Sequence, residues 1–177
     1  MPSKAELQRT LLLIDEEFFL TYGTPNPKPI VVIVGGSAFM LLDLTNRPAT
    51  ANIDVLQSND TVRSIMSSYP VANERVSAYL DQIPYNFEDR LIEIPLRTSA
   101  IRFMTPSLED LAVMKLYAWR QNDIADLTSP NFLGKLDWDL LDHLVNDPDE
   151  AQASALSERR FREMRDLYKQ YREAYRK

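Results

Sequence analysis

The sequence predicts an α/β or α+β domain in which helices flank a small mixed sheet and a helical C-terminal segment closes the chain. Two observations predict this fold class. Strand-like and helix-like segments alternate over the first two thirds of the chain, and helical periodicity dominates the last third. With 177 residues, the chain is long enough for one domain with a helical appendage and too short for two full domains. We therefore expect a main domain over residues 1–135, with residues 136–177 packed on it as helices.

The first predicted helix begins at Ser3, because Ser3-Lys4-Ala5-Glu6 is a capping box. Apolar residues then recur at helical spacing, and Tyr22-Gly23 followed by three prolines ends the helix. Residues 30–34 are all β-branched, which is typical of a buried strand. Gly35-Gly36-Ser37 breaks this strand.

Further helices and strands alternate through the middle of the chain. Apolar spacing predicts helices at residues 38–44, 58–68 and 73–80, and strands at residues 52–57, 90–96 and 100–104. Ser107 followed by Asp110 predicts a helix start, and the pattern stays helical to residue 120. After it we expect a short helix at residues 123–127, a loop at 130–134, a helix capped by Asp137 over 137–145, and a last helix from 157 to the end.

Composition excludes several classes of function. No apolar run approaches the roughly 20 residues that a membrane span needs, and the absence of a signal-like N-terminal segment predicts a cytoplasmic protein. The chain has no cysteine, so it can form neither disulfides nor thiolate metal sites. It has one histidine, His143, which rules out a multi-histidine zinc site. Any metal is therefore expected on carboxylate oxygens, which favours Mg²⁺ or Mn²⁺.

The net charge of −6 is unevenly distributed along the chain. Residues 157–177 contain eight Lys/Arg against four Asp/Glu, so this segment carries +4 and the preceding residues −10. Its basic side chains recur three and four apart, as one helical stripe: Arg162, Arg165, Lys169, Arg172 and Arg176. Such a stripe is able to guide a phosphate backbone, and the alternative is a solvated face of a helix that packs through its aromatic residues.

The Gly35-Gly36-Ser37 turn is the first candidate site. A strand that runs into a tight glycine turn can aim backbone amides at a phosphate, because glycines let the chain approach closely. The alternative is a strand-to-helix turn that simply needs small residues. A dinucleotide site and a P-loop are disfavoured, because neither G-x-G-x-x-G nor the P-loop lysine is present.

The second candidate site is Asn52-Ile53-Asp54, in the next predicted strand. Residues two apart on a strand point the same way, so Asn52 and Asp54 place two oxygen-bearing side chains on one face. Paired oxygens can hold divalent cations, and two cations are the usual device for attack at a nucleotide phosphorus. The alternative is a solvated aspartate on an edge strand.

These segments resemble the minimal and AbiEii-type nucleotidyltransferases, a bacterial branch of the polymerase-beta-like superfamily that includes toxins of toxin–antitoxin systems. Val34-Gly35-Gly36-Ser37-Ala38 is similar to the family's Gly-Gly/Ser motif, and residues 47–54 are similar to its arginine, threonine and D-x-D segment. A later lysine and D-x-x-D-L motif is matched by Glu109-Asp110-Leu111, Lys115, Arg120 and residues 123–127.

The resemblance implies a transferase that moves a nucleotidyl group from a magnesium-bound (or manganese-bound) nucleoside triphosphate to RNA, protein or a small acceptor. It also implies a toxin role with an antitoxin partner as one form of this activity. The residues that it assigns to nucleotide binding are Gly35, Gly36, Ser37, Arg47, Thr50 and Arg120. It assigns metal binding to Asn52 and Asp54, and catalysis to Asp54, Lys115, Asp123 and Asp126.

Asn52 departs from the family pattern, because it stands where the family usually has the first aspartate of D-x-D. A neutral amide gives a metal an oxygen without cancelling its charge, so magnesium affinity should be weaker. Three outcomes stay open: weak activity, compensation by another carboxylate such as Glu93 or Asp43, or a noncatalytic protein of this fold that binds a nucleotide or a partner protein.

Two further residue types have alternative interpretations. Lys115 shares a helical face with apolar residues, so its ammonium either meets an anion or reaches solvent past a packed stem. Asp123 and Asp126 lie three apart and can share a face, although capping is the commoner use of a helical aspartate. We expect Trp119 and Trp138 in the core and His143 in a structural role.

Overall fold

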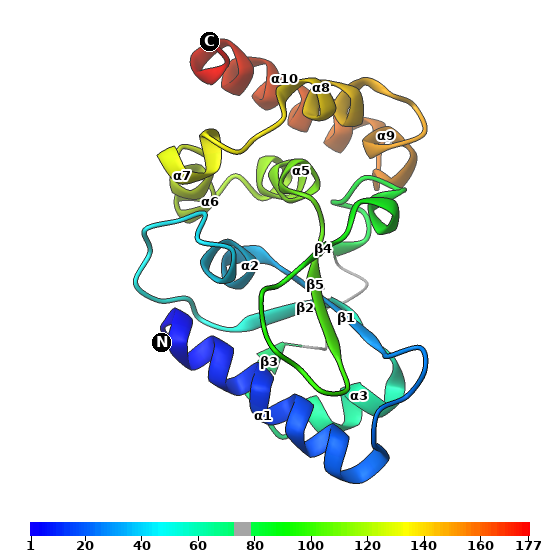
Figure 1. Ribbon diagram of the computed structural model, residues 1–177. Coiled ribbons are helices and arrows are strands. Elements are labelled where there is room, and N and C mark those ends of the chain that lie inside the picture. Colours follow the sequence, from blue (N-terminus) through cyan, green and yellow to red (C-terminus); the bar gives the residue numbers. More distant parts are fainter. Residues whose placement is uncertain (73–78) are drawn as a thin grey trace. The chain divides into compact units, whose positions relative to one another are not determined.

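The structure, a computed structural model, describes residues 1–72 and 79–177 (Figure 1). The chain divides into two compact units. Unit 1 comprises Met1–Val76 and Ile92–Thr105, and unit 2 comprises Ser77–Leu91 and Pro106–Lys177. Unit 2 thus contains residues from both sides of position 135. The predicted boundary between a main domain (1–135) and a helical C-terminal segment (136–177) stays a prediction. The helix predicted at residues 73–80 falls mainly on 73–78, outside the described residues.

Unit 1 is built on a five-stranded mixed sheet with the strand order β3-β2-β1-β5-β4. Its strands are β1 (Ile30–Val34), β2 (Ile53–Gln57), β3 (Val71–Ala72), β4 (Ile92–Glu93) and β5 (Arg102–Thr105). The central strand β1 pairs antiparallel with β2 and parallel with β5. The predicted fold class, a small mixed sheet flanked by helices, is confirmed.

The β-branched run of β1 is buried over four of its five residues: Val31 to Val34 are at most 1% exposed, whereas Ile30 is 38% exposed. The predicted strand at residues 90–96 is wrong for most of its length. Phe87–Arg90 forms a 3-10 turn (η1), and only Ile92–Glu93 pairs in the sheet as β4. The alternating apolar residues there mark burial rather than strand structure, since Ile94 is 2% exposed although it lies outside β4.

Among its described residues, unit 1 contains the helices α1, α2 and α3. α1 (Lys4–Tyr22) begins with the predicted capping box, in which Ser3 N–H donates to Glu6 Oε2 at 2.7 Å, and ends at Gly23 with φ +71°. It lies beside α2 (Gly35–Leu41) and α3 (Asp60–Met66). α2 begins at Gly35, earlier than the predicted residue 38, because both glycines belong to its first turn. α3 is capped by Asn59.

Asp15 is a charged residue on the buried side of α1, and its contacts hold the segment before β5. Its carboxylate accepts hydrogen bonds from the backbone N–H groups of Ser99, Ala100 and Ile101 at 2.7, 2.8 and 2.8 Å. Three such bonds satisfy a buried carboxylate, which would otherwise be costly to desolvate. Asp15 therefore fastens α1 to the chain that leads into the sheet.

From Pro106 to its end, unit 2 is helical. The helices of this segment are α5 (Leu108–Ala118), α6 (Gln121–Leu127), α7 (Pro130–Leu133), α8 (Trp138–Asn146), α9 (Ala151–Ser154) and α10 (Glu158–Tyr175). α5 contacts α6, α8 and α10, and every residue from Glu109 to Tyr117 is buried. The last helix packs through the predicted aromatic stripe, with Tyr171 donating to the carbonyl of Leu127 at 2.6 Å.

Two predictions in unit 2 are corrected. Residues 130–134 were predicted as a loop, but Pro130–Leu133 forms α7, because a proline is well suited to the first position of a helix. The helix predicted to reach residue 120 ends at Ala118, where Trp119 adopts a left-handed conformation with φ 45°. Asp137 caps α8 as predicted, accepting from Leu140 N–H at 3.0 Å. Among residues 1–72 and 79–177, each helix is too short or too polar to span a lipid bilayer.

Candidate functional site

The turn between β1 and α2 is tied to the next strand by Ser37. Its Oγ donates to the carbonyl of Val34 at 3.0 Å and accepts from the backbone N–H of Asp54 at 3.4 Å. Val34 and Asp54 are also direct partners in the antiparallel pairing of β1 with β2. The predicted Gly-Gly turn and the predicted aspartate therefore lie side by side in unit 1.

Gly35 is required by the position of Asp54. Its φ of +71° lies in the left-handed region, which side chains rarely adopt. A Cβ at residue 35 would lie 2.8 Å from Asp54 Oδ2, closer than such atoms approach. The glycine thus leaves room for a carboxylate, which is more specific than a turn that needs only small residues.

Gly36 brings two more of the predicted residues to the same turn. A Cβ at residue 36 would lie 2.8 Å from Arg47 Nη2 and 2.9 Å from Thr50 Oγ1. The Arg47 guanidinium and the Thr50 hydroxyl therefore lie so close to the backbone of the turn that a side chain at residue 36 would collide with both. Unit 1 brings together all of its predicted nucleotide-binding residues: Gly35, Gly36, Ser37, Arg47 and Thr50, with Asp54 beside them.

The segment that carries Arg47 and Thr50 is attached to the start of α1. Thr50 N–H donates to the carbonyl of Pro2 at 3.1 Å, and Lys4 Nζ forms an ion pair with Asp43 Oδ1 at 2.6 Å. Asp43 has a positive φ of 57°, an uncommon conformation for a residue other than glycine. These contacts hold residues 43–50 against the body of unit 1.

The metal ligands that unit 1 offers are few. Asp54 is half-buried in β2, and Asn52 is exposed just before that strand. Of the carboxylates considered as replacements, Asp43 is paired with Lys4, and Glu93 is paired with Arg102 at 3.1 Å. Taken separately, neither unit has three or more His, Cys, Asp or Glu side chains grouped to hold a metal within its described residues.

One carboxylate still fits a magnesium ion that arrives with a triphosphate. Mg²⁺ keeps several waters and is commonly held by one or two carboxylates plus substrate phosphates, not by an all-protein cage. Asp54 beside the glycine turn supplies one such carboxylate, and the amide oxygen of Asn52 is a neutral candidate two residues away. A fully charged two-cation site is not offered by these two residues.

Of the remaining predicted residues, Lys115, Asp123 and Asp126 form a buried charged group in unit 2, and the exposed side chain of Arg120 contacts this group. Lys115 Nζ lies 2.8 Å from Asp123 Oδ1 and 2.8 Å from Asp126 Oδ2. Arg120 donates from both its backbone N–H, at 3.0 Å, and its Nε, at 2.9 Å, to Asp123 Oδ2. Lys115 is 5% exposed, Asp123 2% and Asp126 0%.

This geometry decides between the interpretations of these residues. The Lys115 ammonium does not reach solvent past its stem; it meets two carboxylates from α6. Asp123 accepts the Arg120 N–H at the start of α6, which confirms the capping use for this residue, and Asp123 and Asp126 also share the face of α6 that meets Lys115. Burial alone would raise the pKa of Asp123, and the hydrogen bonds and ion pairs with Arg120 and Lys115 lower it below its usual value.

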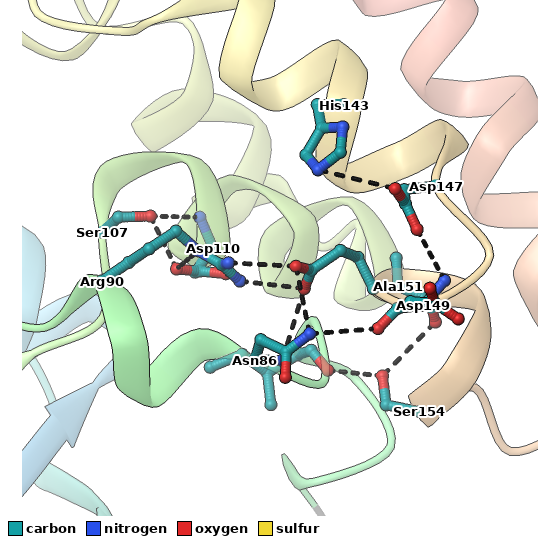
Figure 2. Close-up of polar contacts among 11 residues, drawn as sticks. Asn86, Arg90, Ser107, Asp110, His143, Asp147, Asp149, Ala151 and Ser154 are labelled. Carbon is teal, nitrogen blue, oxygen red and sulfur yellow. Dashed lines mark hydrogen bonds and ion pairs between the residues drawn. The ribbon is translucent and has the colours of Figure 1, made fainter.

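A second polar cluster in unit 2 was not found from the sequence (Figure 2). Arg90 contacts both Asp110, at 2.9 and 3.0 Å, and Glu150, at 3.1 and 3.2 Å. Ser107 Oγ donates to Asp110 at 2.7 Å, and Asn86 donates to Glu150 through its backbone and side-chain N–H groups. The cluster joins η1, the start of α5 and the residue before α9, so its evident role is to fasten three segments.

The sequence contains a partial signal for this cluster. Asp110 lies in the first turn of α5, where a carboxylate is favourable, but it is 0% exposed, and a buried carboxylate needs a cationic partner. Only the fold identifies Arg90 as that partner, from 20 residues earlier.

The other residues that the sequence singled out are the tryptophans, His143 and the basic stripe of the last helix. Trp119 and Trp138 are only half-buried, so the prediction that they lie in the core is wrong; the Trp138 ring packs on that of Tyr171 at a centroid distance of 5.2 Å. Exposed His143 lies 3.6 Å from Asp147. Part of the basic stripe of α10 is paired with α8: Arg172 with Asp142 at 3.0 Å, and Arg176 with Asp139 and Asp142 at 2.5 and 2.6 Å. The solvated, packed interpretation of that helix is therefore favoured over a nucleic-acid surface.

A family model described as "Nucleotidyltransferase of unknown function (DUF6036)" matches residues 9–176. The chain belongs to this nucleotidyltransferase family. The match covers the glycine turn with Asp54 in unit 1 and the Lys115 group in unit 2, so both sets of predicted residues lie within the nucleotidyltransferase region. The narrower AbiEii-type resemblance stays a prediction. No curated protein and no solved structure is significantly similar to the chain.

Proposed function

We propose that the chain is a metal-dependent nucleotidyltransferase that binds a nucleoside triphosphate at the turn after β1. The observation that carries this proposal is the close approach of Asp54 to Gly35, and of Arg47 and Thr50 to Gly36. A carboxylate for a cation, a guanidinium for phosphate and a glycine backbone converge at one point of unit 1. This set of groups suits a magnesium-bound polyphosphate.

Each residue has a stated task in this proposal. Arg47 and the amides of the turn hold phosphate oxygens, with the hydroxyls of Ser37 and Thr50 beside them, and Asp54 holds Mg²⁺ or Mn²⁺. When bound, the cation neutralises charge on the phosphates during transfer. In unit 2, we propose a positioning role for Asp123 and Asp126, which fix the buried ammonium of Lys115, with Arg120 held beside them by Asp123.

The acceptor and the biological role extend this proposal. The resemblance of the motifs to AbiEii-type proteins supports RNA, protein or a small molecule as acceptor, and a toxin controlled by an antitoxin. Nothing in the described residues singles out one acceptor class. The test must therefore supply all of them.

A second candidate function is a noncatalytic protein of the same fold that binds a nucleotide or a partner protein. Asn52 favours it, because an exposed amide replaces a charged metal ligand and neither unit groups three acidic or histidine side chains within its described residues. Weak metal binding would leave the triphosphate bound without transfer.

The experiment compares wild type with Asn52→Asp, Asp54→Asn and the double variant. Each is incubated with every labelled triphosphate, Mg²⁺ or Mn²⁺, and total cellular RNA, protein or small-molecule extract. We expect labelling by wild type, an increase in Asn52→Asp, and loss in both variants that carry Asp54→Asn. Labelling only in Asn52→Asp would indicate a degenerate site. If no folded variant labels an acceptor although each binds triphosphate, the enzyme hypothesis fails and the noncatalytic binding function is supported.

A further inference from the structure

α1 is apolar on two opposite faces. Its inner face is buried against unit 1 through Leu7, Leu11, Ile14 and Phe18, as in an ordinary amphipathic helix. Its outer face carries four large apolar side chains that are well exposed: Leu12 at 40%, Leu13 at 43%, Phe19 at 44% and Leu20 at 76%. The exposed side of the helix is thus not the polar side that such a helix normally presents to water.

The exposed residues belong to one stripe. With 100° between successive residues, positions 9, 12, 13, 16, 19 and 20 point away from the buried face of α1. Single exposed leucines are common, but a row of four large apolar side chains along one helix marks an interaction surface. We call Arg9, Leu12, Leu13, Glu16, Phe19 and Leu20 the outer face of α1.

The two charged residues of the outer face, Arg9 and Glu16, indicate a second copy of α1 as its partner. Arg9 and Glu16 have opposite charge and lie symmetrically on either side of the pair Leu12-Leu13. If a second α1 lies antiparallel across this pair, Arg9 of each copy meets Glu16 of the other, and Leu12 meets Leu13. A two-fold interface requires such self-complementarity, because every contact from residue i of one copy to residue j of the other is repeated from j to i.

Both charges are available for this pairing. Among residues 1–72 and 79–177, neither Arg9 nor Glu16 forms an ion pair, whereas the neighbouring Glu17 accepts a hydrogen bond from Tyr69 Oη at 2.6 Å. The charge next to the stripe is therefore used within unit 1, and the two charges within the stripe are left for a partner.

We propose that the chain forms a two-fold symmetric dimer through antiparallel pairing of the outer faces of two α1 helices. A helix of 19 residues is about 28 Å long, so the interface is small, and a dissociation constant on the order of micromolar is expected. This proposal is independent of the nucleotidyltransferase chemistry, since it uses no residue of the glycine turn.

The test is sedimentation equilibrium of the full chain from about 1 to 300 μM, a range that brackets a micromolar constant. Wild type should change from monomer to dimer across it. Arg9→Glu and Glu16→Arg should each weaken the dimer at least ten-fold, because each places like charges opposite one another. The double variant Arg9→Glu/Glu16→Arg should restore it, since the swapped pair is again complementary. Arg63→Glu, the same charge change on α3, should have no effect.

A second pair of variants tests the apolar side chains of the outer face instead of the Arg9–Glu16 pair. Leu13→Glu and Leu20→Glu alter exposed side chains, so circular dichroism should show intact folding while the dimer is lost. A wild type that stays monomeric to 300 μM overturns the proposal and leaves the face to a different protein. A dimer that survives Leu13→Glu and both single charge reversals uses another surface and also overturns it.

Discussion

The carboxylate of Asp54 crowds the position that a Cβ on residue 35 would occupy: such a Cβ would lie 2.8 Å from Asp54 Oδ2. Two restraints therefore act at Gly35, a left-handed backbone and a neighbouring carboxylate. Gly23 has the same φ of +71° with nothing within 4 Å of the position of its Cβ. The pair allows backbone strain to be separated from crowding at the site.

We predict that Gly35→Ala lowers the free energy of unfolding more than Gly23→Ala does. A positive φ alone should cost each variant about 1–3 kcal/mol, and Gly35→Ala should lose a further ~1 kcal/mol as Asp54 is displaced. Urea denaturation measures the difference. Only Gly35→Ala should also remove the rise in melting temperature produced by a triphosphate with Mg²⁺. Equal losses in the two variants would mean that Asp54 moves away freely.

Gly36→Ala should separate binding from stability. Its added Cβ meets the end of the flexible Arg47 side chain and the Thr50 hydroxyl, so the side chains can yield with little loss of fold. Arg47 would then leave its place at the turn. We predict a stability change below about 1 kcal/mol, together with loss of the triphosphate-induced thermal shift. A retained shift would show that the turn does not hold the phosphates.

The buried ion pairs of Lys115 predict a large effect on stability. Lys115→Met leaves Asp123 and Asp126 without their shared cation in a site that is at most 5% exposed, so unfolding should become easier by about 3–5 kcal/mol. Arg63→Met, which removes the exposed pair with Asp60, should change stability by less than about 1 kcal/mol. Urea denaturation of both variants provides the comparison; similar small losses would contradict a tightly paired Lys115.

Acid should weaken the same group. The pKa of Asp123 lies below its usual value in the folded chain, so its contribution to stability is present above that usual value and is lost as the pH falls through the lowered pKa. Lys115→Met should therefore lose less stability than wild type between about pH 5 and pH 2. A parallel pH dependence in the two proteins would argue against this ion pair.

Glu109 predicts the opposite dependence on pH. Burial, reinforced by the carboxylates of Asp137 and Asp110, raises the pKa of Glu109 to about 7 from its usual 4.5. Between these values the folded chain keeps a proton that the unfolded chain releases, so the Glu109 contribution to stability falls as the pH rises from 4.5 to 7. Glu109→Gln should remove this slope and be more stable than wild type at pH 8 by about 1–2 kcal/mol. Glu163→Gln, at an exposed ion pair on α10, is the control and should leave the slope unchanged.

The sequence predicted those features that depend on neighbours in the chain. The caps at Ser3, Ser107 and Asp137 are local hydrogen bonds between residues three apart, and the β-branched run of β1 is buried because of its own composition. The glycine turn and Asp54 were found together because each carries a short motif of its own. Where local signals were mixed, as at residues 90–96 and 130–134, the prediction was wrong.

The sequence alone predicted the fold class, the positions of the glycine turn and of Asp54, and, through the resemblance, an asparagine at position 52 where an aspartate is expected. Three relationships are visible only in the tertiary structure. Asp54 leaves no room for a side chain at residue 35. Lys115 pairs with Asp123 and Asp126, and Arg90 joins Asp110 to Glu150. The reason is physical. A buried charge must find a partner wherever packing places one, and the Arg90 contacts span 20 and 60 residues, a separation over which no local periodicity carries information.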